Sequence, residues 1–429
     1  MHSGRLFCAT LPGDRRPGRR FGWSIARKPV AFLLCIAFVG PLFHVGTAVG
    51  QAGGLYLPEN GGPINGTAQA GSGAVARDAE TAFLNPAGMT RLDSLEVILT
   101  IMPFSLGFQF NPAPETTVSG SDGGNQGGWF PGLAYFMAVP INERVAAGLS
   151  ITSPAGLVLD PSDDWVARSW TTKSVLIALN FEPSVGVRLG ESWSVGAGLD
   201  IQYLTFQQDL LGPLLDTPIG IDGDSWDVGL SASLLWEPLE TARLALRYRS
   251  RVSHDLDGDL VVNSTRSIST SFTMPMSLTF SAYHEFNEQV ALMVDVGWTD
   301  WSDFDYNVIT FDTSGAAVEL PRNFKDTWTV ALGTHIVPAP DWLVMVGGSY
   351  VSSAVEDENR TPDLPVDQQI RGSVGGEYKI NRRWTAGANY TFLWLGNNRV
   401  DQTRLIARRV AGEYDAVAHI FGIYGALSF

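Results

Sequence analysis

Apolar residues alternate one by one with small or polar residues over unusually long stretches of this chain. In one such stretch, a single face would carry Trp193, Val195, Ala197, Leu199, Ile201 and Tyr203, and the opposite face Ser194, Gly196, Gly198, Asp200 and Gln202. The stretches 290–299 and 384–394 repeat the pattern. Because successive side chains of a β-strand point to opposite faces, alternation of this length predicts strands with one wholly apolar face.

The sequence predicts fourteen such strands, separated by connections of two kinds. The predicted strands span residues 95–110, 129–139, 143–152, 175–189, 192–206, 226–236, 242–253, 271–285, 288–302, 324–338, 341–352, 367–380, 383–395 and 415–429. Short turns such as Gly190-Glu191 alternate with long polar loops at 111–128, 153–174, 207–225, 254–270, 303–323, 353–366 and 396–414. Short turns on one side and long loops on the other are typical of a bacterial outer-membrane barrel.

We therefore predict an all-β fold, a transmembrane antiparallel β-barrel of about 14 strands. Aromatic residues fall at strand ends, as in the belts at membrane–water interfaces. The chain ends on Phe429 after a last alternating strand, and this ending resembles the assembly signal of outer-membrane barrels. A soluble β-sandwich would also alternate, but its strands are usually shorter.

The amino terminus has the three parts of a secretory signal peptide. The first 28 residues are basic, the apolar run VAFLLCIAFVG follows, and small residues surround Ala48 and Ala52. We expect residues 1–52 to be removed; the alternative is a membrane anchor over residues 30–46, which is short for a spanning helix. Both cysteines, Cys8 and Cys35, lie in this part, so no disulfide framework is expected. A formal net charge of -15 argues against a nucleic-acid partner.

The stretch from Ala70 to Leu92 is compact and irregular. It is rich in Gly, Ala and Ser, and small residues let backbone segments pack closely. Pro86 and Gly88 prevent a helix or strand from continuing, and Asn85 can hydrogen-bond its own backbone two residues on. Such a segment needs a surrounding wall, and the downstream strands are the candidate for that wall. The alternative is a linker outside the barrel.

These residues resemble a known family. The run from Gly53-Gly54-Leu55-Tyr56-Leu57 through Arg77-Asp78-Ala79 to Asn85-Pro86-Ala87-Gly88-Met89 is similar to the hatch of FadL-type outer-membrane transporters of hydrophobic compounds. The resemblance continues over most of the chain, for example at residues 180–185, 194–199, 297–302 and 320–328. It departs at Ala155, where related sequences commonly carry an aromatic residue.

The resemblance implies a signal peptide at 1–52, a hatch at 53–93 and a barrel at 94–429. It implies passive uptake of long-chain fatty acids; the alternatives are uptake of aromatic hydrocarbons by the same route and a structural or adhesive barrel. The expected site residues are the hatch motif Asn85, Pro86, Ala87 and Gly88, a lateral opening at Pro154, Ala155 and Gly156, and an apolar acceptance loop with Leu210, Leu211, Leu214 and Leu215. For the loop, packing of its tip against neighbouring chain is an equal alternative. A plain strand end is the alternative for Pro154 and Gly156.

The sequence contains no recognisable catalytic or metal-binding set. The four histidines beyond residue 52, His254, His284, His335 and His419, lack metal-ligand spacing, and no nucleophile elbow or P-loop occurs. We therefore expect no enzyme activity, cofactor or metal; the alternative is a barrel enzyme acting on lipids, with catalytic residues from distant strands. The expected partners of the chain are a hydrophobic ligand and outer-membrane lipid with lipopolysaccharide, and we expect a monomer.

Charged residues fall into two groups. The acidic pairs Asp163-Asp164 and Asp357-Glu358 lie in expected loops, where we interpret them as solvated surface; cation bridging to lipopolysaccharide is the alternative. Arg247 and Arg371 lie on expected strands. A fatty-acid carboxylate could meet either one, but we expect an ion pair with an inward Asp or Glu for both.

Overall fold

A computed structural model describes residues 55–212, 216–304, 306–312, 314–404 and 408–429. The expected signal peptide at 1–52 lies outside these residues, as do Leu214 and Leu215 of the expected acceptance loop. Among the described residues, no helix is both long and apolar enough to cross a membrane.

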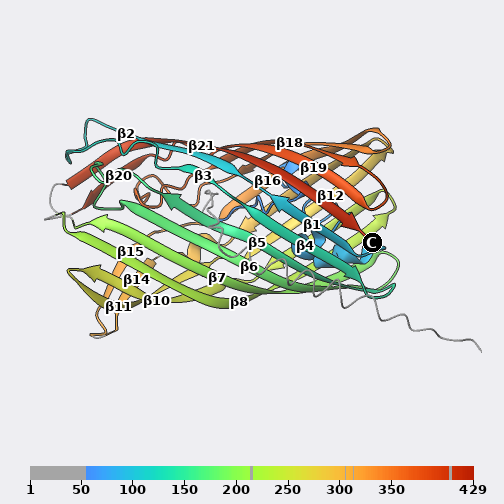
Figure 1. Ribbon diagram of the computed structural model, residues 1–429, viewed down its shortest axis with the longest axis horizontal. Coiled ribbons are helices and arrows are strands. Elements are labelled where there is room, and N and C mark those ends of the chain that lie inside the picture. The colour runs from blue at the N-terminus through green and yellow to red at the C-terminus, as the bar shows by residue number, and fades with distance from the viewer. Residues whose placement is uncertain (1–54, 213–215, 305, 313, 405–407) are drawn as a thin grey trace, which may run out of the picture. The chain divides into compact units, whose positions relative to one another are not determined.

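The described residues form one continuous antiparallel sheet that closes on itself (Figure 1). Its elements are β1 (Glu96–Ile101), β2 (Phe104–Pro112), β3 (Gly128–Phe130), β4 (Leu133–Pro140), β5 (Val145–Leu159), β6 (Lys173–Arg188), β7 (Trp193–Leu211), β8 (Pro218–Leu239), β9 (Ala242–Arg249), β10 (Val252–Val262), β11 (Ser264–Met274), β12 (Ser277–Asn287), β13 (Val290–Thr299), β14 (Tyr306–Phe311), β15 (Ala317–Pro321), β16 (Thr327–Ala339), β17 (Trp342–Val351), β18 (Gln369–Lys379), β19 (Trp384–Trp394), β20 (Val400–Arg404) and β21 (Arg408–Ser428).

Several strands of the wall consist of two of these elements in series, such as β1 with β2 and β9 with β10. Counted in this way, the ring has 14 strands, as the sequence predicts. Closure is made by the first and last strands, with Glu96 opposite Ser428 and Ile101 opposite Ile423. A closed ring leaves no unpaired sheet edge, which the hydrocarbon of a membrane would not tolerate.

Alternation along each strand places apolar side chains outside and small or polar ones inside. On β16, the outward Trp328, Val330 and Leu332 are 50% exposed or more, while the inward Ala331 is buried. The apolar face is therefore the lipid-facing one. The small inward residues leave room inside the ring. At Gly347, for example, an added Cβ would lie 2.0 Å from the carbonyl oxygen of Thr67.

The barrel has one end with long loops, the loop end, and one with short connections, the turn end. At the loop end, much of the chain expected to be loop is strand. The expected loops 207–225, 254–270, 303–323 and 396–414 contain the ends of β7 and β8, the β10–β11 hairpin, the β14–β15 hairpin, and β20 with the start of β21. Backbone pairing continues past the lipid-facing zone because a hydrogen-bonded ladder needs no apolar side chains.

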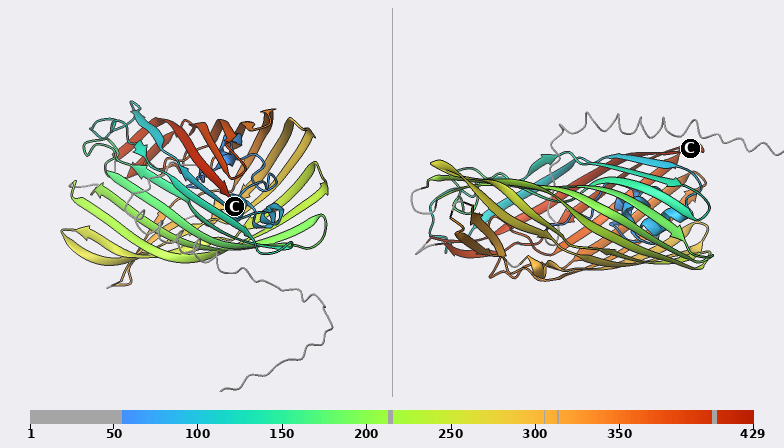
Figure 2. Two further views of the ribbon diagram at one scale, coloured as in Figure 1. Left: turned by 45° about the vertical axis from the view of Figure 1, so that its right-hand side comes forward. Right: turned by 90° about the horizontal axis from the view of Figure 1, so that it is seen from below.

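Residues 55–92, the lumenal segment, lie inside the ring toward the turn end (Figure 2). They contain three short helical turns, η2 (Pro63–Thr67), α2 (Thr81–Leu84) and η3 (Pro86–Arg91). Most of these residues are buried, and the turns contact the inner wall on several sides, from β4 and β5 round to β18 and β19. The amino-terminal chain thus occupies much of the interior toward the turn end, and a cavity of about 490 Å³ remains beside Arg77 and Asp78.

Candidate functional site

The lumenal segment is held in shape by a side-chain cap at its centre. Asn85 is fully buried, and its side-chain oxygen accepts a hydrogen bond from the Ala87 amide at 3.1 Å. The amide nitrogen of the same side chain donates to the carbonyl of Gly73 at 2.5 Å. Pro86 follows as the first residue of η3, where its missing N–H leaves no helical bond unmade. Asn85 therefore joins two parts of the segment that lie twelve residues apart in sequence.

Polar side chains of the wall fasten the segment to the barrel. Asp295 of β13 accepts hydrogen bonds from the amides of Gly71 at 2.8 Å and Ser72 at 3.1 Å. Arg243 of β9 donates to the carbonyl of Ala74 at 2.8 Å. An ion pair joins Arg77 to Glu377 of β18. Because these groups sit on different strands, the segment is anchored on several sides.

The third wall strand changes course where the sequence carries Pro154. Thr152 of β5 pairs with Asn180 and Ala155 pairs with Ala178, so two residues of β5 oppose one residue of β6 in a β-bulge. On its other side, the pairing of β5 with β4 extends only as far as Ile151 opposite Tyr135. The expectation that Pro154, Ala155 and Gly156 follow the end of this strand is wrong, because β5 continues to Leu159.

Beyond Ile151, this side of β5 pairs with the lumenal segment in place of the barrel wall. Tyr56 forms an antiparallel bridge with Ala155. The amide of Leu57 donates to the carbonyl of Pro154 at 2.7 Å, and the amide of Gly156 donates to the carbonyl of Leu55 at 3.2 Å. Proline has no N–H to give to a ladder, which explains why regular pairing stops here. The backbone ladder between β4 and β5 is therefore incomplete beside the segment.

At the loop end, a groove of about 350 Å³ opens between the extended hairpins. We call it the loop-end groove. Its apolar walls include Leu210, Ile219, Ile221, Leu260, Ile309, Phe311, Val318 and Leu320. Leu210, from the expected acceptance loop, is buried against Ile221 and Ile268 while it also lines the groove, and Leu211 is half-buried at the end of β7. The Leu210 side chain thus packs on its neighbours, and acceptance of a ligand by this loop stays a prediction.

Two arginines line the loop-end groove, and they differ in their partners. Arg322 is buried and holds Asp363 through two hydrogen bonds, at 2.8 and 3.1 Å. Arg404 lies over the ring of Trp170, with the guanidinium carbon 4.6 Å from the ring centroid, and donates to the carbonyl of Ser169. Among the described residues, Arg404 forms no ion pair. The groove is thus mainly apolar, and one of its two arginines has no ion-pair partner among the described residues.

Asp363 is an acid whose environment fixes its charge. Burial raises its pKa, but the charge of Arg322 and hydrogen bonds from Arg322, Thr361 and Gln208 outweigh burial and hold the pKa below its ordinary value. The carboxylate is therefore ionised at neutral pH, and it forms a neutral bidentate pair with Arg322 at the base of the groove.

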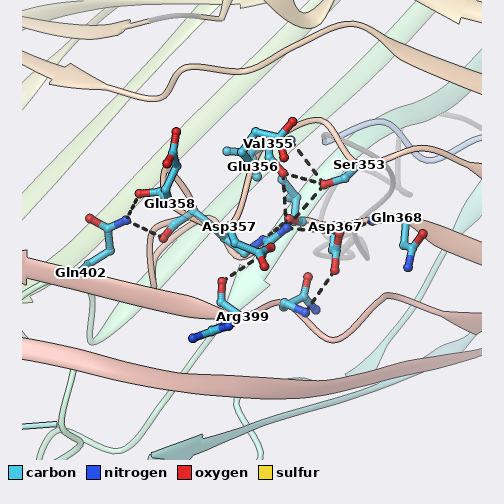
Figure 3. Close-up of polar contacts among 12 residues, drawn as sticks. Ser353, Val355, Glu356, Asp357, Glu358, Asp367, Gln368, Arg399 and Gln402 are labelled. Atoms are coloured by element: carbon cyan, nitrogen blue, oxygen red, sulfur yellow. Dashed lines mark hydrogen bonds and ion pairs between the residues drawn. The ribbon is translucent and has the colours of Figure 1, made fainter. Parts of the chain in front are cut away.

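The loop that carries Asp363 is tied down by a buried arginine. Arg360 is 1% exposed and donates to the carbonyls of Val366 at 2.7 Å and Arg399 at 2.8 Å. Figure 3 shows this network, in which Asp357 also takes part and Gln402 donates to the carbonyl of Glu358 at 2.8 Å. Asp357 and Glu358 are both exposed, as expected for solvated surface, while Asp357 also pairs with Arg360 and Glu358 lines the groove.

Two further cavities follow the groove into the barrel. The narrow cavity, of about 30 Å³, shares Gln208, Ile221 and Arg322 with the groove and reaches Leu157 of β5. The lumenal cavity, of about 160 Å³, lies on the lumenal segment and is lined by Tyr56, Leu57, Phe83, Pro154 and Trp301, among others.

An aromatic cluster stands between these two cavities. Phe272 and Phe304 line the narrow cavity, and their ring centroids lie 4.8 Å apart. Tyr56 and Trp301 line the lumenal cavity, with centroids 5.5 Å apart. The ring centroids of Trp301 and Phe304 lie 6.4 Å apart in an edge-to-face arrangement, which connects the two pairs. The cavities and the cluster thus form an apolar series from the loop end to the irregular part of β5.

The remaining predicted residues take the following places. Arg371 is in an ion pair with Glu59 at 2.5 Å, as predicted. The same prediction for Arg247 is wrong, because Arg247 takes part in none of the ion pairs among the described residues, and its buried Nη1 has no hydrogen-bond partner there. Among the described residues, no cluster of three metal-ligating side chains occurs. Asp164 is exposed, and hydrogen bonds from Ser162 and Ser121 lower its pKa.

Fold and cavities together define a class of protein: an outer-membrane barrel that holds its own amino-terminal segment in the lumen beneath a series of apolar cavities. Residues 43–429 match the family described as outer membrane protein transport protein (OMPP1/FadL/TodX). The chain belongs to this family, and the resemblance seen in its sequence is confirmed.

Individual relatives agree with this assignment. The chain is 28% identical over 394 residues to the long-chain fatty acid transport protein of Escherichia coli O6:H1, which covers 79% of this chain and 86% of the relative. A solved FadL homologue from Pseudomonas aeruginosa has a TM-score of 0.81 at 20% identity, covering 87% of this chain and 99% of that one. The toluene transporter TodX of P. putida has a TM-score of 0.61 at 16% identity, covering 82% and 94%. The two solved structures support the fold alone.

Proposed function

We propose that this protein carries hydrophobic molecules across the outer membrane by passive uptake, with long-chain fatty acids as its main cargo. The observation that carries the proposal is the apolar series from the loop-end groove through the narrow cavity to the lumenal cavity. Apolar cavities with a few placed polar groups suit such ligands. The name of the Escherichia coli relative supports the same cargo.

The lumenal segment acts in this proposal as a hatch. It lies in the lumen below the cavities and is fastened to several strands, so it would obstruct an aqueous path along the barrel axis. Asn85, Pro86, Ala87 and Gly88 hold its central turn in one conformation.

Release would be sideways, at Pro154, Ala155 and Gly156. This part of β5 is bulged against β6 and pairs with residues 55–57 in place of the wall. If those pairings open, the wall beside the lumenal cavity has no continuous backbone ladder. An apolar ligand could then pass into the adjacent lipid, where it is more stable than in water.

Uptake of aromatic hydrocarbons is the second candidate. The aromatic cluster of Tyr56, Phe272, Trp301 and Phe304 favours it, since such rings pack well against an arene. Arg404 in the loop-end groove favours the fatty acid, because a carboxylate accepts charge-assisted hydrogen bonds from a guanidinium, whereas an arene offers it only a weaker cation–π contact.

Uptake by intact cells tests the proposal. Cells that express the chain in place of their own transporters should take up labelled oleate faster than cells with an empty vector, and toluene uptake should be measured alongside. Faster toluene uptake with unchanged oleate uptake would transfer the function to the second candidate. Uptake of neither compound would leave a structural or adhesive barrel.

A further inference from the structure

The narrow cavity and the lumenal cavity are separated by aromatic rings. Among the described residues, none lines both cavities. Four side chains, each at most 7% exposed, stand at this place: Phe272, Trp301, Phe304 and Phe324. We call them the aromatic septum. The ring centroid of Phe304 lies 4.8 Å from that of Phe272 and 4.9 Å from that of Phe324.

The aromatic septum closes the series of cavities where the series is narrowest. The loop-end groove holds about 350 Å³ and the lumenal cavity about 160 Å³, but the narrow cavity between them holds only about 30 Å³. The centroids of Trp301 and Phe324 lie 5.9 Å apart, which completes the packing of the four rings. A lipid chain therefore passes from the groove to the lumenal cavity only if these rings move.

Two of the four rings come from one short turn. Trp301 is the first residue of η4 (Trp301–Asp303), and Phe304 is its C-cap, with its amide bonded to the carbonyl of Trp301 at 2.9 Å. The pairing of β13 with both of its neighbours ends at Thr299, before this turn begins. The bond from the Phe324 amide to the Phe304 carbonyl is long, at 3.4 Å. The turn is thus able to move as a unit without breaking the ladder of the barrel.

The polar contacts that hold this turn lie toward solvent. Asp303 pairs with Arg251 at 2.6 Å, and the side chains are 33% and 51% exposed. The amide of Ser302 donates to Asp326 at 3.3 Å. Because exposed ion pairs stabilise a conformation only weakly, the packing of the rings is the main contact that keeps the turn closed.

Ring packing of this kind opens for some molecules and not for others. An apolar chain that enters the septum replaces contacts between rings with contacts between ring and chain, so little dispersion energy is lost. Water offers no such replacement, and it loses hydrogen bonds in apolar surroundings. The septum therefore favours the passage of apolar chains and opposes the passage of water.

We propose that Trp301 and Phe304 form a gate that selects the transported molecule by its cross-section. The inference rests on the proposed function and adds specificity-determining residues to it. The substrate class that passes is the unbranched acyl chain, which needs an opening only as wide as itself. A chain with methyl branches needs a wider one, for which the turn has to leave Phe272 and Phe324.

Uptake of two acids by intact cells tests the gate. Palmitate is unbranched, and phytanate has the same main chain and head group with added methyl branches. Phe304→Ala should raise the ratio of phytanate to palmitate uptake about tenfold, the size of discrimination that a small apolar group gives in a hydrophobic passage. The metabolism of the host cell affects every ratio alike, so the comparison between variants isolates the barrel.

Phe304→Leu is a second variant that keeps more of the packing. It should raise the ratio in the same direction by a smaller factor, and it decides the result if the alanine variant gives no heat-modifiable barrel. Phe311→Ala is the matched control, because Phe311 lines the loop-end groove and lies outside the septum. Its ratio should equal that of the unaltered chain.

Three results would overturn the gate. An unchanged ratio in the Phe304 variants would show that the septum does not select. An equal rise in Phe311→Ala would place the selection at the entrance. Neither of these two results affects the proposed function. Uptake of neither acid by the unaltered chain would overturn the proposed function, and the gate with it.

Discussion

The backbone amide of Leu57 donates a 2.7 Å hydrogen bond to the carbonyl of Pro154. This bond ties the start of the lumenal segment to the one part of β5 that leaves the regular ladder. Beside it, Tyr56 and Ala155 face each other across an antiparallel bridge. The lumenal segment therefore occupies the backbone pairing positions of β5 that the barrel wall leaves free.

If these pairings must open for release, locking them should stop transport. Tyr56→Cys with Ala155→Cys places two thiols at bridged positions, where Cα atoms lie within the range that a disulfide spans. The only native cysteines, Cys8 and Cys35, lie in the expected signal peptide. We expect oxidised double-mutant cells to take up oleate several-fold more slowly than the same cells after reduction.

Each single cysteine variant serves as the control, since it carries the substitution without the crosslink. Its uptake should not change with oxidation. Full uptake by the crosslinked barrel, with the disulfide verified by mass spectrometry, would show that the segment need not leave β5.

Arg404 should distinguish ligands by charge at the loop end. Arg404→Gln removes a half-buried cation that has no ion-pair partner among the described residues, so we expect about 1 kcal/mol of lost carboxylate affinity, roughly fivefold. Half-maximal uptake of oleate should therefore need a correspondingly higher concentration, while toluene uptake stays the same. Arg399→Gln, exposed and nearby, is the control. A matching effect of the two substitutions would mean general surface charge and no specific contact.

The strand number, the closed ring and the lipid-facing residues were predictable because they depend on period-two alternation, which is local in sequence. The strand ends were not, as β7 and the β10–β11 hairpin show. Their outer parts carry polar residues on the outward face, where a membrane would demand apolar ones. The amino-acid composition of these outer parts therefore resembles that of a loop, although their backbone forms the same ladder as the rest of the strand.

The site depends on contacts between residues that are far apart in the sequence, and such contacts could not be predicted from the sequence alone. Tyr56 and Ala155 lie about a hundred residues apart, and no pattern around Tyr56 indicates a partner. Likewise, an acid for Arg371 was predictable, but the lack of one for Arg247 depends on Glu182, Asp200 and Asp295 being bound elsewhere. Only the three-dimensional arrangement shows which charged side chains have no ion-pair partner among the described residues.

The ion pair between Asp363 and Arg322 should make the loop-end groove sensitive to acid. The pKa of Asp363 in the folded protein lies below its ordinary value near 4. The pair therefore stabilises the loop fully above that ordinary value, and the stabilisation is lost as the pH falls through the lowered folded value. Hydrogen exchange of residues 353–368 should show protection that holds from neutral pH to about pH 4 and then decreases.

Asp363→Asn should already reduce that protection at neutral pH and should flatten its dependence on acid. Asp357→Asn alters a carboxylate of the same loop whose side chain is 63% exposed, so it should have a smaller effect. Equal loss of protection in both variants would place the stability of the loop in the network of Arg360 and not in the Asp363–Arg322 pair.

The cap at Asn85 should matter for the hatch and not for the barrel. Asn85→Ala with Pro86→Ala removes the hydrogen bonds to Ala87 and Gly73 and frees the backbone of the turn. A buried group left unpaired costs about 1–3 kcal/mol, enough to loosen a segment that is held by such contacts. The strand ladder does not involve these residues, so the variant should still reach the outer membrane as a folded, heat-modifiable barrel. In liposome swelling assays it should admit small sugars that the unaltered chain excludes, and oleate uptake should slow.

Asn381→Ala is the matched control, because Asn381 accepts two backbone hydrogen bonds in an exposed turn, from Arg383 at 2.8 Å and Trp384 at 3.0 Å. A double variant that is as tight and as active as this control would show that the turn does not keep the lumen closed.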